Sequence, residues 1–221
     1  MALSDRRILD AITDGSVVIE PFNDKHLSTS SYDVTLGQWH FRERKPKPGF
    51  HLYDIFDKEH TDHVWGTEAE QAPLARDILG TLKLRGIKPD QQVILLTPGE
   101  TILAHTNEYI GGRGHITTMM KARSSLGRNF IEVCKCAGWG DVGYINRWTM
   151  EITNNSQHYT IPLVVGMRIA QIIFFETGPI RNSKSDYTKK GKYADSNNLA
   201  ELKQSWKPNQ MLPRIYKDIR T

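Results

Sequence analysis

Apolar and polar residues alternate along most of this chain, and this period of two is typical of β-strands with one buried face. Before the first alternating segment, Ser4 and Gly15 bracket the stretch DRRILDAI, which predicts a short helix with a capping residue and a glycine stop. The alternating segments are residues 30–37, 91–97, 101–106, 115–120, 130–136, 146–153 and 167–175. Because turn-forming Gly, Pro and Asn residues separate these short segments, we expect an all-β sandwich or barrel rather than βαβ units.

Two regions do not show this alternation of apolar and polar residues. Residues 41–90 are polar and rich in His, Asp, Lys and Pro, and we interpret them as an insertion with its own hairpin or short helix. Residues 178–221 contain a polar stretch, a possible helix at 198–206 and a basic end. The pattern predicts a β domain over residues 1–177 and a C-terminal arm that orders on binding.

Composition narrows the class of protein. The 221 residues are 38% apolar and 24% charged, which is ordinary for one soluble globular domain. The net charge of +4 is scattered, which favours a small anionic ligand over nucleic acid. Apolar runs fall short of the ~18 residues that a membrane span needs, and the charged start is unlike a secretory signal. We therefore expect neither a membrane nor a nucleic acid as partner.

Cys134 and Cys136 alternate within one expected strand, so that their side chains should point the same way. Such positions rarely allow a mutual disulfide, and a reducing, cytoplasmic setting is the simplest interpretation. A second cysteine pair that could complete a tetrahedral zinc site is missing from the sequence, as is the H-x-E with P-C-x-x-C pattern of zinc deaminases. The sequence therefore predicts no zinc centre.

A carboxylate stands within the last but one of these strands, NRWTMEIT. Trp148, Met150 and Ile152 should point to one face of it. The polar residues Arg147, Thr149, Glu151 and Thr153 should point to the other. A lone carboxylate on a strand with one buried face is costly unless it has a partner or a task. The alternative is a solvent-facing polar row on an edge strand.

Two further segments offer binding chemistry. KARSSLGR supplies the guanidinium groups of Arg123 and Arg128, the hydroxyl groups of Ser124 and Ser125, and a glycine, a set that suits a polyphosphate. It lacks the G-K-[ST] arrangement of a Walker loop, and a basic surface loop with salt bridges is the alternative. In AGWGDVGY, Asp141 stands on a glycine-rich turn, where it could face a ligand or bond its own backbone.

Taken together, these segments resemble the dCTP deaminases of the trimeric dUTPase superfamily. The matching pieces are LSDRRIL, SSYDVTLG, KARSSLGR, AGWGDVGYINRWTMEITN, VVGMRIAQIIFFE and GKY. The resemblance implies a mainly β, dUTPase-like distorted β-barrel or jelly-roll subunit over residues 1–177. It also implies a homotrimer whose active sites are shared between subunits, with 178–221 as an arm closing over each site.

The resemblance also implies roles for single residues. Glu151 would be the catalytic acid and base, while Ser124 and the backbone carbonyl of Ala137 would hold the attacking water. Arg128 would act beside the site from a neighbouring subunit. Asp141 would face the deoxyribose 3′-hydroxyl.

Three further groups of binding residues follow from the resemblance. Thr149 and Met150 would read the edge of the base through backbone groups. Tyr187, Lys192 and Tyr193 would form the lid. The triphosphate loop would comprise Arg123, Ser124, Ser125, Leu126, Gly127 and Arg128. Mg²⁺ would be bound through the triphosphate, without metal-ligating protein residues and without zinc.

Two positions depart from the family pattern. Ser196 stands where a lid glutamine is usual, so the binding of the triphosphate and the closure of the lid are in doubt. Asn146 stands where a glycine is usual. Asn is tolerable there because it accepts left-handed backbone angles.

The function that the resemblance implies is hydrolytic deamination of dCTP to dUTP and ammonia in pyrimidine deoxynucleotide metabolism. A bifunctional enzyme giving dUMP and pyrophosphate is the first alternative, because AGWGDVGY looks more like the loop of bifunctional members. A pure dUTPase fits less well, since that branch usually lacks a glutamate at the position of Glu151. The altered tail and the insertion motivate a non-catalytic nucleotide-binding regulator on the same fold, and a structural β-barrel component is a more distant alternative.

Overall fold

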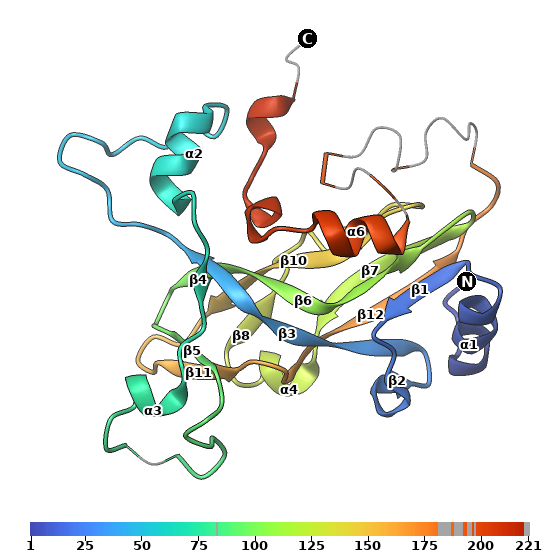
Figure 1. Ribbon diagram of the computed structural model, residues 1–221, viewed down its shortest axis with the longest axis horizontal. Helices are drawn as coiled ribbons and strands as arrows, with labels where there is room; N and C mark the ends of the chain where they lie inside the picture. The colour runs from blue at the N-terminus through green and yellow to red at the C-terminus, as the bar shows by residue number, and fades with distance from the viewer. Residues whose placement is uncertain (83, 181–186, 188–191, 194–195, 197, 219–221) are drawn as a thin grey trace.

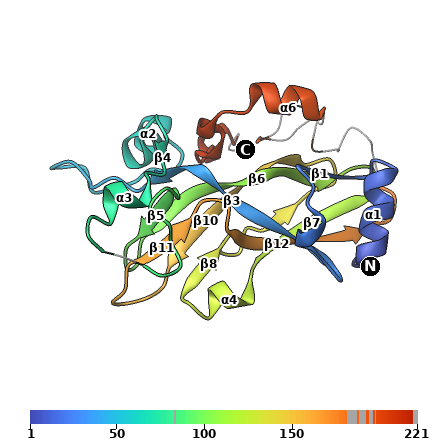
Figure 2. The same cartoon turned by 60° about the horizontal axis from the view of Figure 1, so that its bottom comes forward.

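The structure is a computed structural model, and it describes residues 1–82, 84–180, 187, 192–193, 196 and 198–218. Its centre is a curled antiparallel sheet (Figures 1 and 2), in which the main strands lie in the order β8-β10-β6-β3-β12-β7-β9. Their bounds are β3 (Ser31–Arg42), β6 (Thr101–Gly112), β7 (Ile116–Ala122), β8 (Ile131–Val133), β9 (Trp139–Gly140), β10 (Ile145–Asn154) and β12 (Arg168–Glu176). The prediction of a mainly β fold is therefore confirmed.

Short strands extend this sheet. β1 (Val17–Glu20) pairs with β6, while β2 (Leu27–Ser28) and β4 (Glu70–Gln71) pair with β3. β5 (Val93–Leu96) and β11 (Ile161–Val164) form a separate two-stranded sheet. We did not predict β1, β2, β9 or β11, because strands of two to four residues are too short to show a clear alternation.

The core lies on the inner face of the curled sheet. Trp148, Met150 and Ile152 on β10 are buried there beside Tyr32 and Phe174. On β10 the buried positions alternate with half-exposed ones, including Glu151, from Arg147 to Ile152. The predicted division of this strand into an apolar and a polar face is thus confirmed.

The helices are short and peripheral. They are α1 (Asp5–Thr13), α2 (Lys58–Trp65), α3 (Ala75–Ile78), α4 (Ser124–Gly127) and α6 (Leu199–Ser205), with 3₁₀ turns η1 (Asp24–His26), η3 (Pro208–Met211) and η4 (Ile215–Lys217). The first helix begins as predicted, since the Ser4 hydroxyl accepts a hydrogen bond from the Arg7 amide. The region 41–90 contains α2, α3 and β4, and the helix expected at 198–206 is α6. Within the described part of the chain, no helix is both long and apolar enough to cross a membrane.

The strand predicted over residues 130–136 is wrong in its second half. β8 ends at Val133, because Cys134 and Lys135 have φ angles of 65° and 41°, which are incompatible with a strand. Cys134 is consequently buried while Cys136 is exposed, so the two free thiols do not share a face as we expected.

The two sides of the sheet carry different segments. α6 and the turns that follow it lie on one side, and α4 lies on the other (Figures 1 and 2). Within one chain, the loop that forms α4 therefore lies on the opposite side of the sheet from the C-terminal segment. The pocket described below lies under that segment.

Candidate active site

Glu151 faces a pocket of about 460 Å³ on the outer side of β10. Its neighbour across the sheet is Leu103 on β6, so the carboxylate stands beside an apolar surface. Burial raises the pKa of the Glu151 carboxyl, against the opposing effects of its own backbone amide and the Lys135 ammonium. A carboxyl with a raised pKa is a stronger base than an ordinary carboxyl, so it is better suited to accept a proton and return it.

Aromatic side chains line the pocket next to this carboxylate. The Tyr144 ring meets the rings of Trp148 and Tyr187 edge to face, with centroids 5.2 and 5.1 Å apart. Burial raises the pKa of the Tyr144 hydroxyl, so that the group is neutral. The arrangement offers flat apolar surfaces suited to a heteroaromatic ring.

Asp141 enters the pocket wall through a closely packed glycine turn. A Cβ on Gly140 would lie 2.3 Å from the Thr118 hydroxyl and 2.5 Å from the Trp148 ring, so only glycine fits there. The Asp141 carbonyl accepts a hydrogen bond from the Tyr144 amide at 3.0 Å, which closes the turn. The backbone thus fixes Asp141 at the edge of the pocket.

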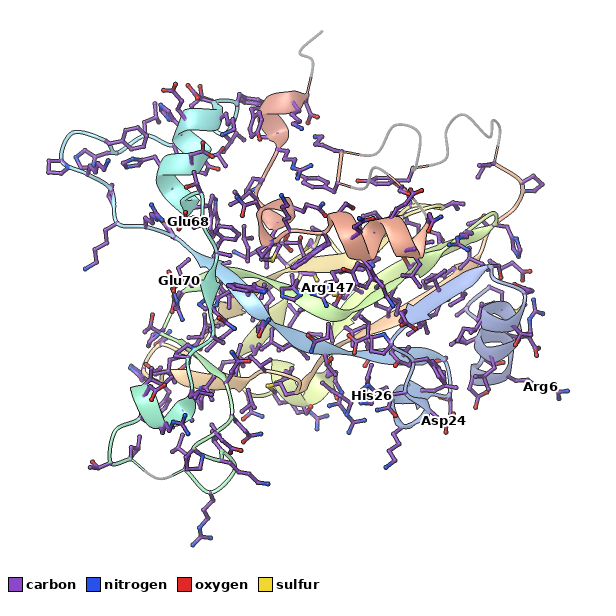
Figure 3. All side chains as sticks on the ribbon, in the orientation of Figure 1. Arg6, Asp24, His26, Glu68, Glu70 and Arg147 are labelled. Carbon is purple, nitrogen blue, oxygen red and sulfur yellow. The ribbon has the colours of Figure 1, made fainter. Side chains whose placement is uncertain are left out.

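The C-terminal segment forms the opposite wall. The Trp206 ring, just after α6, lies 4.7 Å from the guanidinium of Arg147, which also contacts the Tyr109 ring at 5.1 Å. Arg147 is labelled in Figure 3. The His105 ring lies 4.7 Å from Trp206 on the other side. Burial lowers the pKa of His105 to about 4, so this histidine is neutral and acts as a packing group.

Further along the segment, Met211 and Leu212 pack on Phe41 and Leu103 of the sheet. Trp65 at the end of α2 packs against the same cluster. Both the 41–90 region and the tail therefore contribute to the wall beside Glu151.

The expected lid residues lie beside this wall and are held by the end of the chain. The Tyr193 hydroxyl accepts a hydrogen bond from the Arg214 amide at 3.2 Å, and the Arg214 guanidinium donates to the Lys192 carbonyl at 2.9 Å. The Lys192 ammonium pairs with Asp218. Asn146 donates from its side chain to the Tyr193 carbonyl at 3.1 Å, so the residue that departs from the family pattern has a structural partner here.

Ser196 lies just before Asn198, the N-cap residue of α6, and does not line the pocket. Its hydroxyl accepts from the Asn198 amide at 3.0 Å and donates to Glu201 at 2.6 Å. Most of residues 181–197, including Asn197, lies outside the described residues.

The basic loop expected to bind triphosphate forms the single turn α4 and its flanks on the other side of the sheet. The Arg123 Nε lies 3.2 Å from a carboxylate oxygen of Asp33 on β3. The pocket beside Glu151 has no lining residue from 123–128. The structure of one chain therefore does not bring these residues to Glu151.

The predicted residues thus fall into separate places. Those that line the pocket are Ala137, Asp141, Thr149, Glu151, Tyr187 and Tyr193. The side chain of Met150 is fully buried in the core, which leaves only its backbone for a ligand.

Other lining residues were missed: Trp65, Leu103, Trp139, Tyr144, Asn146, Arg147, Trp148, Trp206, Gln210, Met211 and Pro213. Alternation along NRWTMEIT places Arg147 on the same face as Glu151. Of the missed residues, Arg147 alone could therefore have been predicted from this pattern. Among the described residues, no group of three or more His, Cys, Asp or Glu side chains is placed to hold a metal ion.

Comparison with known proteins agrees with this geometry. The profile of the dCTP deaminase-like family matches residues 2–177. The chain belongs to the dCTP deaminase-like family. The match ends before the C-terminal segment that walls the pocket.

Two relatives support this membership, and a solved structure shows the same fold. The chain is 34% identical over 176 residues to a "dCTP deaminase, dUMP-forming" of Hydrogenobaculum sp. strain Y04AAS1, covering 79% of this chain and 81% of the relative. It is 31% identical over 183 residues to a protein of the same name from Methanococcus maripaludis strain S2, covering 80% and 82%. The crystal structure of a 2′-deoxycytidine 5′-triphosphate deaminase from Agrobacterium tumefaciens shares the fold, with a TM-score of 0.54 at 18% identity. That match covers 83% of this dCTP deaminase-like chain and 50% of the other.

Proposed function

We propose that this protein deaminates dCTP and releases dUMP, with ammonia and pyrophosphate as the other products. The observation that carries the proposal is a half-buried carboxylate of raised pKa, Glu151, in an aromatic pocket of a dCTP deaminase-like protein. The names of the relatives favour dUMP over the dUTP that we expected first from the sequence.

Glu151 performs the proton transfers in this proposal. Its carboxylate takes a proton from water, and the resulting hydroxide attacks C4 of the cytosine ring. The carboxyl returns that proton to N3, takes the remaining proton from the new C4 hydroxyl and passes it to the amino group. The amino group then departs as ammonia, and C4 retains the oxygen as the uracil carbonyl. A second water cleaves the α–β phosphoanhydride bond, so that dUMP and pyrophosphate form. The raised pKa supports this dual use, because one group must both accept and donate protons.

The site is proposed to be completed by a second copy of the chain. Arg123, Ser124 and Arg128 carry the donors that a triphosphate needs, yet they lie on the side of the sheet opposite the C-terminal segment. A closed homotrimer resolves the separation, because the loop of one subunit then meets the pocket of its neighbour. In this arrangement Ser124 and the Ala137 carbonyl hold the water, and Arg128 stabilises the developing charge.

The remaining contacts follow from the pocket. Asp141 binds the deoxyribose 3′-hydroxyl, the backbone of Thr149 and Met150 reads the base, and Tyr187, Lys192 and Tyr193 cover the triphosphate. Mg²⁺ would be held by the bound triphosphate rather than by protein side chains, and it would supply charge neutralisation for the pyrophosphate group.

The test is product analysis with dCTP and, separately, with dUTP, measuring ammonia, dUTP, dUMP and pyrophosphate. The proposal predicts equal amounts of ammonia and pyrophosphate from dCTP, with little free dUTP. Ammonia without pyrophosphate would instead identify a deaminase that stops at dUTP. Tight nucleotide binding without ammonia would overturn the enzyme assignment and favour a regulator.

A further inference from the structure

The pocket beside Glu151 contains an arginine that has no acidic partner. Arg147 lines this pocket, and its guanidinium lies over the Tyr109 ring on β6 and over the Trp206 ring of the C-terminal segment, 5.1 and 4.7 Å from their centroids. Among the described residues, its side chain forms no ion pair and no hydrogen bond, and its buried Nε has no acceptor. The proposed function gives this group no task.

The two rings hold the guanidinium without using its donors. Aromatic rings contact the flat face of a guanidinium, whereas hydrogen bonds leave along its edge. Arginine carries five N–H donors and no acceptor, so a stacked Arg147 can still bind an anion through two parallel hydrogen bonds. Of the described residues that line the pocket, Arg147 is the single basic one. The pocket therefore presents one fixed positive charge.

Strand geometry sets the distance between this charge and the reacting carboxylate. Arg147, Thr149 and Glu151 lie on the same face of β10. Four residues of extended strand span about 13 Å. A cytosine whose C4 lies beside Glu151 is too short to reach that far. The phosphate chain of the same nucleotide is long enough, because the deoxyribose lies between the base and the phosphates.

The residues expected to form the lid lie at the same end of the pocket. The Asn146 side chain, next to Arg147 in the sequence, donates a hydrogen bond to the Tyr193 carbonyl at 3.1 Å. The Tyr193 amide in turn donates to the Tyr187 hydroxyl at 3.2 Å. The residues proposed to cover the triphosphate therefore lie beside Arg147.

We propose that Arg147 binds the β-phosphate of the substrate and stabilises the pyrophosphate that leaves. The inference rests on the proposed function and concerns its second step. In that step a water oxygen bonds to the α-phosphorus, and the bond from this phosphorus to the α–β bridging oxygen breaks. The bridging oxygen keeps the electron pair and leaves within pyrophosphate, while the proton of the attacking water passes to solvent. Two guanidinium hydrogen bonds stabilise the negative charge that develops on the leaving group.

Arg147→Gln tests this role by the ratio of the two products. At saturating dCTP the variant should release ammonia at close to the native rate, because deamination develops no charge on the phosphates. Pyrophosphate release should fall about 10- to 100-fold, the size expected for a charge-assisted hydrogen bond, so that dUTP accumulates. Arg76→Gln is the matched control, because Arg76 is exposed, pairs with Asp77 and lies in the 41–90 region; it should keep the native ratio.

The same ratio separates this role from a structural one. Arg147 also packs on Trp206, so a loss of packing alone would open the pocket wall and lower both products together. An unchanged ratio of pyrophosphate to ammonia in Arg147→Gln would overturn the proposal, whether both rates are native or both are reduced. Arg147→Lys keeps the charge but not the two parallel hydrogen bonds, so its ratio should lie between those of Arg147→Gln and the native protein. If Arg147→Gln does not fold, a native ratio in Arg147→Lys overturns the proposal.

Failure of the proposed function has a different signature. If the native protein releases ammonia from dCTP but no pyrophosphate from dCTP or dUTP, the proposed second step fails, and the catalytic part of this inference fails with it. Calorimetry with inorganic pyrophosphate and Mg²⁺ then tests the phosphate contact itself. An affinity about 10- to 100-fold weaker in Arg147→Gln supports the contact, and equal affinity overturns it. If the native protein releases both products and Arg147→Gln keeps their ratio, the proposed function stands and this inference is wrong.

Discussion

Trp206 anchors the C-terminal segment that walls the pocket, and Trp206→Ala should loosen that segment. The substitution removes the contact with the Arg147 guanidinium at 4.7 Å, worth about 1 kcal/mol for a partly buried cation–π pair. It also removes the contact with the His105 ring at 4.7 Å, worth about 1 kcal/mol. The sum of about 2 kcal/mol should raise the population of the detached segment roughly 30-fold.

Limited trypsin digestion measures this detachment, because Lys203, which is followed by Gln204, is a cleavage site within the segment. We expect cleavage there to accelerate by about the same factor of 30 when opening is fast relative to cleavage. KM for dCTP should rise as well, since the pocket loses a wall. Tyr159→Ala is the control, because Tyr159 is a 69% exposed aromatic residue on the turn before β11. Equal cleavage rates in Trp206→Ala and the native protein would refute the anchoring role.

Three further outcomes follow from the site and its supports. Glu151→Gln should lower kcat for ammonia release by roughly 10²- to 10⁴-fold, whereas Glu176→Gln, at an exposed ion pair, should leave it native. Because burial raises the pKa of Glu151, the folded protein holds that proton more tightly than the unfolded chain. Glu151→Gln should therefore match the native stability below pH 4.5 and exceed it as pH rises through the raised pKa; equal urea midpoints at all pH values would contradict this. Gly111→Ala should cost about 2–3 kcal/mol in urea unfolding, since its Cβ would lie 1.9 Å from the Tyr144 carbonyl, whereas Gly86→Ala, in open space, should be near neutral.

The strands that build the pocket could be predicted because their burial follows a simple period. In β10 the alternation of Trp148, Met150 and Ile152 with Thr149 and Glu151 is visible in the sequence and present in the structure. The same reasoning failed at Cys134 and Lys135, whose positive φ angles depend on the turn into the glycine loop rather than on hydrophobic pattern.

The walls of the pocket could not be predicted, because they depend on contacts between distant segments. Trp65 and Met211 pack in one cluster with Leu103 only once the insertion and the tail pack on β6. Neither segment has a sequence motif that predicts this packing. Family resemblance named Asp141, Glu151 and the basic loop, but it gave no sign that Asp33 joins Arg123 to Arg168. Ion pairs of this kind follow from strand register, which local sequence does not specify.

In the proposed trimer, Glu151 of one subunit and Arg128 of another act on one dCTP molecule. Co-expression of Glu151→Gln and Arg128→Ala chains under two affinity tags allows purification of mixed assemblies only. In a mixed trimer with shared sites, one of the three sites combines an intact Glu151 with an intact Arg128. We therefore predict that the mixed trimers recover about one third of native ammonia release, although each variant is inactive alone. Ammonia release no higher than that of the single variants would contradict it.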